Sequence, residues 1–207
     1  KKIIYIKKYK KEKKVFSFFI KEKNFSNDWF TENIPVWLSI LKWIKEEKID
    51  CLEIGSYEGM SALFTLKYFN QSQVDCVETF GGSDEHKKIN FDKVEKNFNQ
   101  NLKDYTNRYN LYKMTSDGFF LYFSKTKTYD LIYIDGSHHS KQVYKDAINS
   151  FNCLKKNGIM IFDDFLKKYY LDINENPISA IFEFIKKNKN NLDVIYVGYQ
   201  LFIKKII

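Results

Sequence analysis

Three aspartates follow two short apolar runs in this sequence, at spacings that could build a site for chemistry. Residues 131–134 lead into Asp135, and residues 159–162 lead into Asp163 and Asp164. Apolar runs without polar alternation are typical of strands covered on both faces of a parallel sheet. In two parallel neighbours the three carboxylates would share one edge and repel one another unless protons or a cation intervene. A divalent cation with oxygen ligands is therefore the expected occupant.

The segment between the two runs predicts a helix. Gly158 follows it, where a helix C-terminus favours a residue with positive φ. Strand, helix and strand then form a right-handed β-α-β unit, and such sheets bind ligands at their carboxyl edge. The simpler interpretation is that Asp135 opens a turn and that Asp163 and Asp164 begin a solvated loop. The apolar residues that recur at helical spacing are Val143, Tyr144, Ala147, Ile148, Phe151 and Leu154.

A second candidate site lies around Gly55. Residues 49–54 predict a strand, followed by the turn Gly-Ser-Tyr-Glu-Gly-Met-Ser and a helix through residues 62–69. Glycines let a ligand approach the backbone and a helix N-terminus offers free N–H groups, so this order is typical of a nucleotide-type cofactor loop. The Gly-x-x-x-Gly spacing lacks the second glycine of the dinucleotide fingerprint. Glu53 would repel a pyrophosphate, yet it suits a cofactor that carries an ammonium and a sulfonium.

Glu78 ends the next predicted strand, residues 74–77. It lies about 20 residues after the first glycine, a placement from which an acid can accept hydrogen bonds from both ribose hydroxyls. A polar loop is expected at residues 81–86. Residues 109–112 predict a third strand, which ends near Ser116 and Asp117.

The C-terminal part predicts a helix at residues 177–187 and then two strands, residues 194–196 and 200–203, joined at Gly198. Two strands joined at a glycine predict a hairpin, so the last strand should run antiparallel to its neighbours. The expected fold class is α/β, a Rossmann-like, doubly wound, mostly parallel seven-stranded sheet with a terminal antiparallel hairpin strand.

The 207 residues are enough for one domain with a substantial core. No run of about 18 apolar residues is present, so no membrane span is expected. We divide the chain into an N-terminal extension or flap, residues 1–27, and a main domain, residues 28–207. Cys51, Cys76 and Cys153 are odd in number and lack Cys-x-x-Cys spacing, which favours small core residues in a reducing, cytoplasmic compartment.

The N-terminal residues give the weakest pattern. Residues 3–6 and 15–20 are short apolar pieces among lysines, which fits a hairpin, an accessory flap or part of an upstream region. Pro35 then opens a predicted helix that runs to Ile44. Trp29 and Phe30 just before it could wall a pocket, but packing in the core is the preferred interpretation.

The net charge of +8 raises the question of nucleic acid. Arg108 is the only arginine, and no compact stripe of arginines and aromatics marks a nucleic-acid track. The lysines are therefore interpreted as a solvated surface, and nucleic acid is not the expected partner.

With these segments placed, the sequence resembles the class I S-adenosylmethionine-dependent methyltransferases. Residues 52–62 (Leu-Glu-Ile-Gly-Ser-Tyr-Glu-Gly-Met-Ser-Ala) match the first motif of the metal-dependent catechol-type O-methyltransferases. Residues 134–138 (Ile-Asp-Gly-Ser-His) and 158–164 together resemble the bacterial methyltransferase-24 family and the sugar-modifying macrocin-type enzymes near it. The resemblance covers about residues 28–204.

The resemblance implies two ligands, S-adenosyl-L-methionine and a divalent metal such as magnesium. Glu78 would hold the ribose, Ser116 and Asp117 would approach the adenine, and Asp135 would lie beside the cofactor. Metal binding would fall to Asp135, Asp163 and Asp164. The methionine part of the cofactor would be lined by Glu53, Gly55, Ser56, Tyr57, Gly59 and Ser61.

The general base departs from the family pattern. Macrocin-type enzymes often place an aspartate where this chain has Ser137, and catechol-type enzymes place a lysine where it has His138. A histidine can take a hydroxyl proton near neutral pH, so we assign the base to His138, with His139 as the less favoured neighbour. The alternative is that His138 caps the following helix or binds the cofactor. Asp135 is the second residue assigned to catalysis.

The expected activity is metal-assisted O-methylation of a hydroxyl on a sugar, a glycan or another small molecule. The alternatives are an RNA or other nucleic-acid methyltransferase, a nicotinamide-dependent oxidoreductase, and a degenerate module without activity. The Asn/Asp-Pro-Pro-aromatic tetrad of amino-methylating enzymes is absent from the end of the fourth strand. The sequence leaves open whether the chain forms a homo-oligomer.

Overall fold

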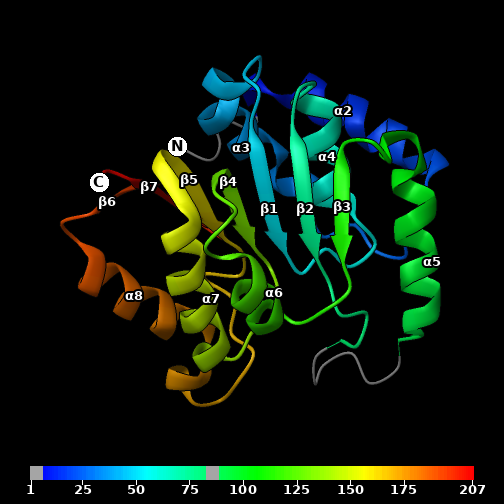
Figure 1. The fold of residues 1–207 in the computed structure, drawn as a ribbon. Coiled ribbons are helices and arrows are strands. Elements are labelled where there is room, and N and C mark those ends of the chain that lie inside the picture. Colours follow the sequence, from blue (N-terminus) through cyan, green and yellow to red (C-terminus); the bar gives the residue numbers. More distant parts are fainter. Residues whose placement is uncertain (1–6, 83–88) are drawn as a thin grey trace.

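The computed structural model describes residues 7–82 and 89–207. They form one seven-stranded sheet with the strand order β3-β2-β1-β4-β5-β7-β6, and helices cover both of its faces (Figure 1). The first five strands are parallel, whereas β7 is antiparallel to both β5 and β6. This arrangement confirms the predicted fold class. The strands are β1 (Asp50–Ile54), β2 (Gln73–Val77), β3 (Tyr109–Tyr112), β4 (Tyr129–Ile134), β5 (Leu154–Phe162), β6 (Leu192–Val197) and β7 (Leu201–Lys205).

Two apolar cores lie on opposite faces of the sheet. One packs β-strand residues against α2 (Lys10–Phe19), α3 (Ile34–Leu41), α4 (Met60–Tyr68) and α5 (Phe91–Leu102). The other packs the opposite face against α6 (Ser116–Phe123), α7 (Ser140–Cys153) and α8 (Pro177–Asn188). Short 3₁₀ turns lie between or beside these helices, at Ile20–Glu22, Thr31–Asn33, Lys42–Ile44, Lys103–Tyr105 and Ile173–Glu175.

The register of the parallel strands sets the position of the site. Ile54 pairs with Val77 on one side and with Ile134 on the other, and Ile134 pairs with Phe162. The residues that follow these strand ends are Gly55, Glu78, Asp135 and Asp163. All four therefore leave the sheet at the same carboxyl edge, as the sequence predicted.

The connection between β4 and β5 differs from the prediction at its end. Helix α7 ends at Cys153, and β5 begins at Leu154, so Gly158 lies inside the strand and not at the helix C-terminus. The residue with a positive φ is Asn157, at 66°. The expected positive φ at Gly158 is therefore wrong, because the chain turns from helix to strand before it.

Residues 10–22 are helical, so the hairpin alternative is wrong. Residues 15–20 belong to α2 and the turn after it, and Phe16 inserts its buried ring edge-on against Phe64 of α4. The predicted apolar piece at residues 3–6 lies outside the described residues. Most of the polar loop predicted at residues 81–86 lies outside them as well. Pro35 falls in the first turn of α3, as expected.

The three cysteines are buried and unpaired, in agreement with their interpretation as small core residues. Within residues 7–82 and 89–207, no helix is both long and apolar enough to cross a membrane.

Candidate active site

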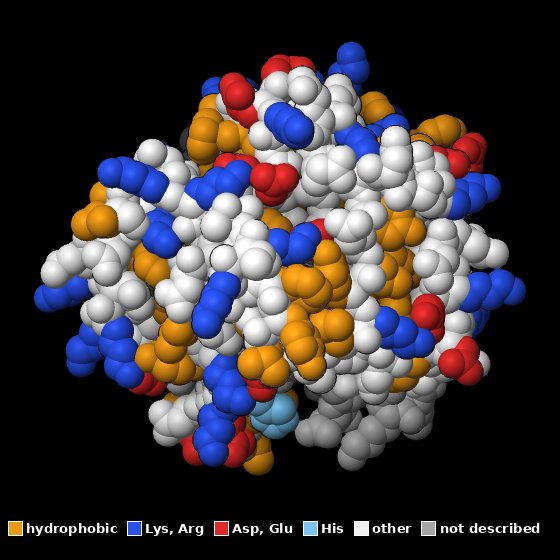
Figure 2. Space-filling view, viewed as in Figure 1, with side chains coloured by type: hydrophobic (Ala, Val, Ile, Leu, Met, Phe, Trp, Pro, Cys, Tyr) orange, Lys and Arg blue, Asp and Glu red, His pale blue; other side chains and the backbone are white. Residues whose placement is uncertain are grey.

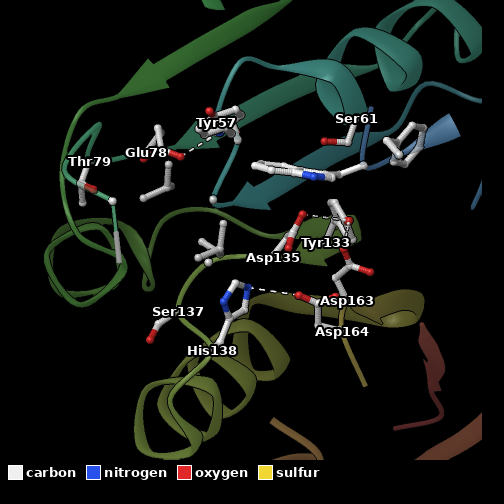
Figure 3. A pocket seen from close by; sticks show the side chains of 18 of the residues that line it. Tyr57, Ser61, Glu78, Thr79, Tyr133, Asp135, Ser137, His138, Asp163 and Asp164 are labelled. Carbon is white, nitrogen blue, oxygen red and sulfur yellow. Dashed lines mark hydrogen bonds and ion pairs between the residues drawn. The ribbon is translucent and has the colours of Figure 1, made fainter. Parts of the chain in front are cut away.

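A cavity of about 1150 Å³ opens at the carboxyl edge of the sheet. It joins the Gly55 turn, Glu78, and the acidic residues after β4 and β5 into one space (Figure 3). Two of the predicted residues, Glu53 and Gly59, do not line it. The predicted residues that do line it are Gly55, Ser56, Tyr57, Ser61, Glu78, Ser116, Asp117, Asp135, His138, Asp163 and Asp164.

The Gly55 turn has a conformation that requires glycine. Gly55 has a φ of +83°, and a Cβ built there would lie 2.1 Å from the carbonyl oxygen of Asp135. The backbone after β1 thus lies directly against the backbone after β4. Gly59, at a φ of +80°, precedes α4, and a Cβ on it would meet Leu102 of α5 at 2.5 Å. The two glycines shape the turn through close packing, which is the reason for their spacing.

Glu53 lies buried beneath this turn. Its carboxylate accepts a hydrogen bond from Ser61 Oγ at 2.9 Å. Burial raises the pKa of Glu53 to about 7, and the hydrogen bond only partly opposes this rise. A carboxyl poised in this range can become charged when a cationic ligand group approaches.

Glu78 is held by the backbone on both of its oxygens. Oε2 accepts from Tyr57 N at 2.8 Å, and Oε1 accepts from Phe80 N at 2.8 Å. Tyr57 and Phe80 both have positive φ, at 47° and 50°. The two turns therefore fix the orientation of the carboxylate at the cavity wall, and its remaining lone pairs are available to a ligand.

Ser116 and Asp117 begin α6 at the cavity, and their partners on α7 were not among the predicted site residues. Gln142 Nε2 lies 3.2 Å from Ser116 Oγ, 3.2 Å from Asp117 Oδ1 and 3.0 Å from Asp146 Oδ1. Hydrogen bonds from Gln142 and Lys145 lower the pKa of Asp117, whereas burial raises the pKa of Asp146 to about 6. The i, i+4 spacing of Gln142 and Asp146 on an amphipathic helix was the available signal.

Asp135 and Asp163 converge on a single hydroxyl. The oxygen of Tyr133 lies 3.1 Å from Asp135 Oδ2 and 2.9 Å from Asp163 Oδ2. Gln200 Nε2 donates to Asp163 Oδ1 at 3.0 Å, and Gln200 is oriented in turn by Trp37 Nε1 at 2.8 Å. Asp163 is thus anchored through Gln200 to the buried Trp37, and both aspartates line the cavity.

Asp164 is buried and has a φ of 51°, in the left-handed region. Tyr169 and Tyr199 donate hydrogen bonds to its two oxygens. His138 Nε2 lies 3.2 Å from Asp164 Oδ2, and the imidazole stacks on the Tyr169 ring at 3.9 Å (Figure 3). In Figure 3 the His138 ring points toward Asp164, whereas Ser137 points away from it.

The negative charges of these carboxylates need protons or a cation to balance them. Burial and the charges of Asp163 and Asp164 raise the pKa of Asp135 well above its ordinary value, and burial and Asp164 raise that of Asp163. One potential ligand atom each from Asp135, His138 and Asp164 lies within 4.8 Å of the others. A set of carboxylates and an imidazole at this spacing fits a divalent cation, because a cation relieves the repulsion that raises the pKa values.

Part of the cavity wall comes from residues next to the predicted domain boundary. Phe30 is buried in the core, as preferred from sequence, but Trp29 is 55% exposed and lines the cavity with its ring 5.0 Å from that of Tyr57. Three tyrosines also escaped prediction, since a tyrosine in a strand or loop carries no motif of its own. They are Tyr133, Tyr169 and Tyr199.

Lysines are spread over several elements on the face seen in Figure 2.

Comparison with solved structures shows the same fold in three methyltransferase-like proteins. MycE, the methyltransferase from the mycinamycin biosynthetic pathway solved with Mg, SAH and mycinamycin VI, is 14% identical with a TM-score of 0.64. The match covers 87% of this chain and 50% of MycE, so this chain spans about half the length of that protein.

Two shorter proteins match over most of both chains. A proposed caffeoyl-CoA O-methyltransferase from Staphylococcus aureus is 16% identical, with a TM-score of 0.66, over 100% of this chain and 99% of that one. A proposed rRNA methylase from Clostridium thermocellum is 14% identical, with a TM-score of 0.59, over 80% of this chain and 94% of that one. One fold thus serves proteins with different named acceptors, so the acceptor must be argued from the cavity.

The sequence itself gives the family. No curated protein matches the chain significantly. The family model described as a methyltransferase domain, Methyltransf_24, matches residues 52–165, which run from the Gly55 turn through the three aspartates. This match covers more than half of the chain and argues against the nicotinamide alternative. The chain therefore belongs to the methyltransferase-24 family.

Proposed function

We propose that this protein transfers a methyl group from S-adenosyl-L-methionine to a hydroxyl of a sugar, glycan or other small molecule, with the help of a divalent cation. The observation that carries the proposal is the single cavity that joins the Gly55 turn and Glu78 to the group Asp135, His138 and Asp164. A donor and a metal-bound acceptor need such a shared space.

The donor side would bind the cofactor through residues already fixed in place. Glu78 would accept hydrogen bonds from the ribose with the lone pairs that its two backbone contacts leave free. Ser116 and Asp117 would lie at the adenine. The turn at residues 55–61 would receive the methionine part, with Glu53 beneath it to balance positive charge.

The acceptor side would hold the hydroxyl at the carboxylates. Asp135, Asp163 and Asp164 would hold the cation, which supplies a positive charge that lowers the pKa of a bound hydroxyl. His138 would take the proton on a ring nitrogen, and its stacking on Tyr169 keeps the imidazole in place. Alignment of the two reactants in one cavity would supply much of the acceleration, worth up to about 7 to 11 kcal/mol.

A neutral sugar hydroxyl favours this chemistry. Such a hydroxyl is a poorer nucleophile than a phenol, so a cation is needed more. The exposed ring of Trp29 offers an apolar surface at the cavity, of the kind that packs against the C–H face of a sugar. MycE, which was solved with Mg and mycinamycin VI, supports the same combination of metal and acceptor.

RNA methylation is the second candidate, favoured by the net charge of +8 and by the fold of the proposed rRNA methylase. It predicts RNA retention that weakens steeply with salt, with a slope set by the number of phosphates contacted. Retention that is absent at low salt would exclude it.

The proposal is tested by calorimetry and by turnover. Adenosylhomocysteine should bind the purified protein, and NAD should not. Methyl transfer to a panel of glycosides, followed as adenosylhomocysteine release, should stop in chelator and return with Mg²⁺ or Mn²⁺. Full turnover in chelator would reject the metal, and absence of adenosylhomocysteine binding would reject the donor.

A further inference from the structure

Glu58 lies between Gly55 and Gly59 in the donor-binding turn, yet its carboxylate is directed into the protein. It is only 2% exposed. Its two oxygens accept three hydrogen bonds, two of which come from the N-terminal segment. Ser26 N lies 2.6 Å and Ser26 Oγ 3.0 Å from Oε2, and Asn97 Nδ2 of α5 lies 2.7 Å from Oε1.

A second set of hydrogen bonds holds the N-terminal segment at Asn101, one turn after Asn97 on α5. Asn101 Nδ2 donates to Glu58 O at 3.0 Å and to Asn24 O at 3.1 Å, and Asn101 Oδ1 accepts from Asn24 N at 2.7 Å. Residues 24–26 are thus held to the turn and to α5 by partners 32 and 77 residues away in sequence. Asn97 and Asn101 are buried, so water does not compete freely for these bonds.

The segment that begins at these contacts continues along the cavity. Asp28 caps the turn that follows, since its Oδ1 accepts from Thr31 N at 2.9 Å. Trp29 packs on Tyr57, whose own N–H is held by Glu78. A contact path therefore leads from Glu78, through the turn that carries Tyr57, to this part of the wall. The residues of the segment that line the cavity are Phe25, Asn27, Asp28, Trp29, Phe30, Glu32 and Asn33.

We propose that Glu58 is a positioning residue that fastens the wall segment, residues 24–33, to the donor-binding turn, so that donor binding and ordering of this wall are coupled. The inference rests on the proposed function for the donor only. Coupling is reciprocal, so whatever orders the wall segment tightens donor binding, and donor binding orders the wall segment. Residues 24–27 then belong to the catalytic unit, although the sequence placed them in an extension.

The test compares amide hydrogen exchange of residues 24–33 with and without adenosylhomocysteine, in wild type and in Glu58→Gln. This substitution keeps the shape of the side chain but turns an acceptor oxygen into an NH₂ that faces N–H or O–H donors. In wild type, adenosylhomocysteine should slow exchange of the wall segment several-fold. In Glu58→Gln this segment should exchange fast with or without ligand, and ligand affinity should fall roughly tenfold, within the usual range of coupling.

Two further variants keep the result interpretable. Glu95→Gln removes a partly exposed carboxylate of α5 that pairs with Lys113, and it should leave both readouts unchanged. Ser26→Ala removes one of the three hydrogen bonds to Glu58 without touching the core. It should give a smaller loss of protection and of affinity than Glu58→Gln, and it replaces that variant if Glu58→Gln does not fold.

A purely structural role would raise exchange throughout the sheet and leave the ligand-dependent protection of residues 24–33 intact, which would overturn the proposal. Ligand binding to wild type without any slowing of this segment would also overturn it. A wild-type protein that does not bind adenosylhomocysteine at all would contradict the proposed donor site, and with it this coupling.

Discussion

Two parts of the cavity are built in different ways. We call the part around Gly55 and Glu78 the donor side, and the part around the three aspartates the metal side. On the donor side, Glu78 is held by two backbone N–H groups within 21 residues of it, and Gly55 packs backbone against backbone. On the metal side, Asp163 is held by the side chain of Gln200, 37 residues away in sequence. Backbone contacts thus shape one side, and side-chain packing shapes the other.

The two sides also differ in charge. The carboxylates of the metal side repel one another, which adds to the rise that burial causes in the pKa of Asp135. The polar contacts are in place on both sides, but on the metal side a cation would also offset the repulsion between the carboxylates.

Gly55→Ala should disrupt both the donor side and the metal side, because Gly55 lies against Asp135. It is the largest expected effect. The added Cβ would lie 2.1 Å from the carbonyl oxygen of Asp135, at a φ of +83°. Overpacking and backbone strain together should cost about 3 kcal/mol or more of unfolding free energy and abolish adenosylhomocysteine binding. Denaturant unfolding and calorimetry measure this. Gly81→Ala is the matched control, because its nearest neighbour would be Thr79 Oγ1 at 3.4 Å.

Asp135→Asn should impair the metal side and leave the donor side unchanged. Loss of a ligand and of one charge should lower turnover about 10³-fold, equivalent to several kcal/mol of transition-state stabilisation. Adenosylhomocysteine affinity should change less than about threefold, because Glu78 and the Gly55 turn are untouched. A parallel loss of donor affinity would show that the two sides are not separable in this way.

Glu53→Gln tests the buried carboxyl beneath the donor side through the pH dependence of stability. Because the folded pKa of about 7 lies above the unfolded value near 4.5, the folded protein keeps this proton longer. The Glu53 contribution to stability is therefore full at low pH and falls as pH rises through about 4.5 to 7. At pH 8 the variant should be more stable by up to about 3 kcal/mol, and the two proteins should converge near pH 4.5. Equal pH profiles by thermal unfolding would contradict the burial of this charge.

His138→Ala distinguishes a base from a ligand. As a base, it should lower turnover by roughly 10²-fold, with metal and donor affinities nearly unchanged. Its Nε2 lies 3.2 Å from Asp164 Oδ2, so a ligand role would instead appear as a loss of Mn²⁺ affinity. His139→Ala tests the less favoured base at the exposed neighbouring position, and it should leave turnover nearly unchanged.

Glu78→Gln should give the smallest effect in this series. The amide keeps one acceptor for the backbone but presents an NH₂ to the other N–H group, and it loses charge-assisted bonds to a ribose. Adenosylhomocysteine should bind about tenfold more weakly, which corresponds to about 1.4 kcal/mol. Unchanged affinity by calorimetry would place the ribose elsewhere.

The same contrast between backbone contacts and side-chain packing explains what the sequence could predict. Gly55, Glu78, Asp135 and Asp163 follow strands with clear apolar patterns, so their arrival at one edge follows from the parallel sheet alone. The prediction for the end of α7 was wrong because the helix passes directly into β5 at Leu154, and the positive φ falls inside that strand, at Asn157.

Side chains that meet across the fold could not be predicted from local patterns. Tyr199 reaches Asp164 over 35 residues, and Ser26 reaches Glu58 over 32. Neither tyrosine nor serine spacing carries information about such distant partners. The N-terminal wall was only partly predicted for the same reason, because the contact of Ser26 with Glu58 joins it to the donor-binding turn across the fold.

The most direct test is a crystal structure of the protein with adenosylhomocysteine and Mn²⁺, with the metal located by anomalous scattering. We expect one manganese bound by Asp135, Asp163 and Asp164, with the sulfur of adenosylhomocysteine in the same cavity between that ion and the Gly55 turn. A manganese bound elsewhere, or a donor bound outside this cavity, would contradict a shared site for donor and metal.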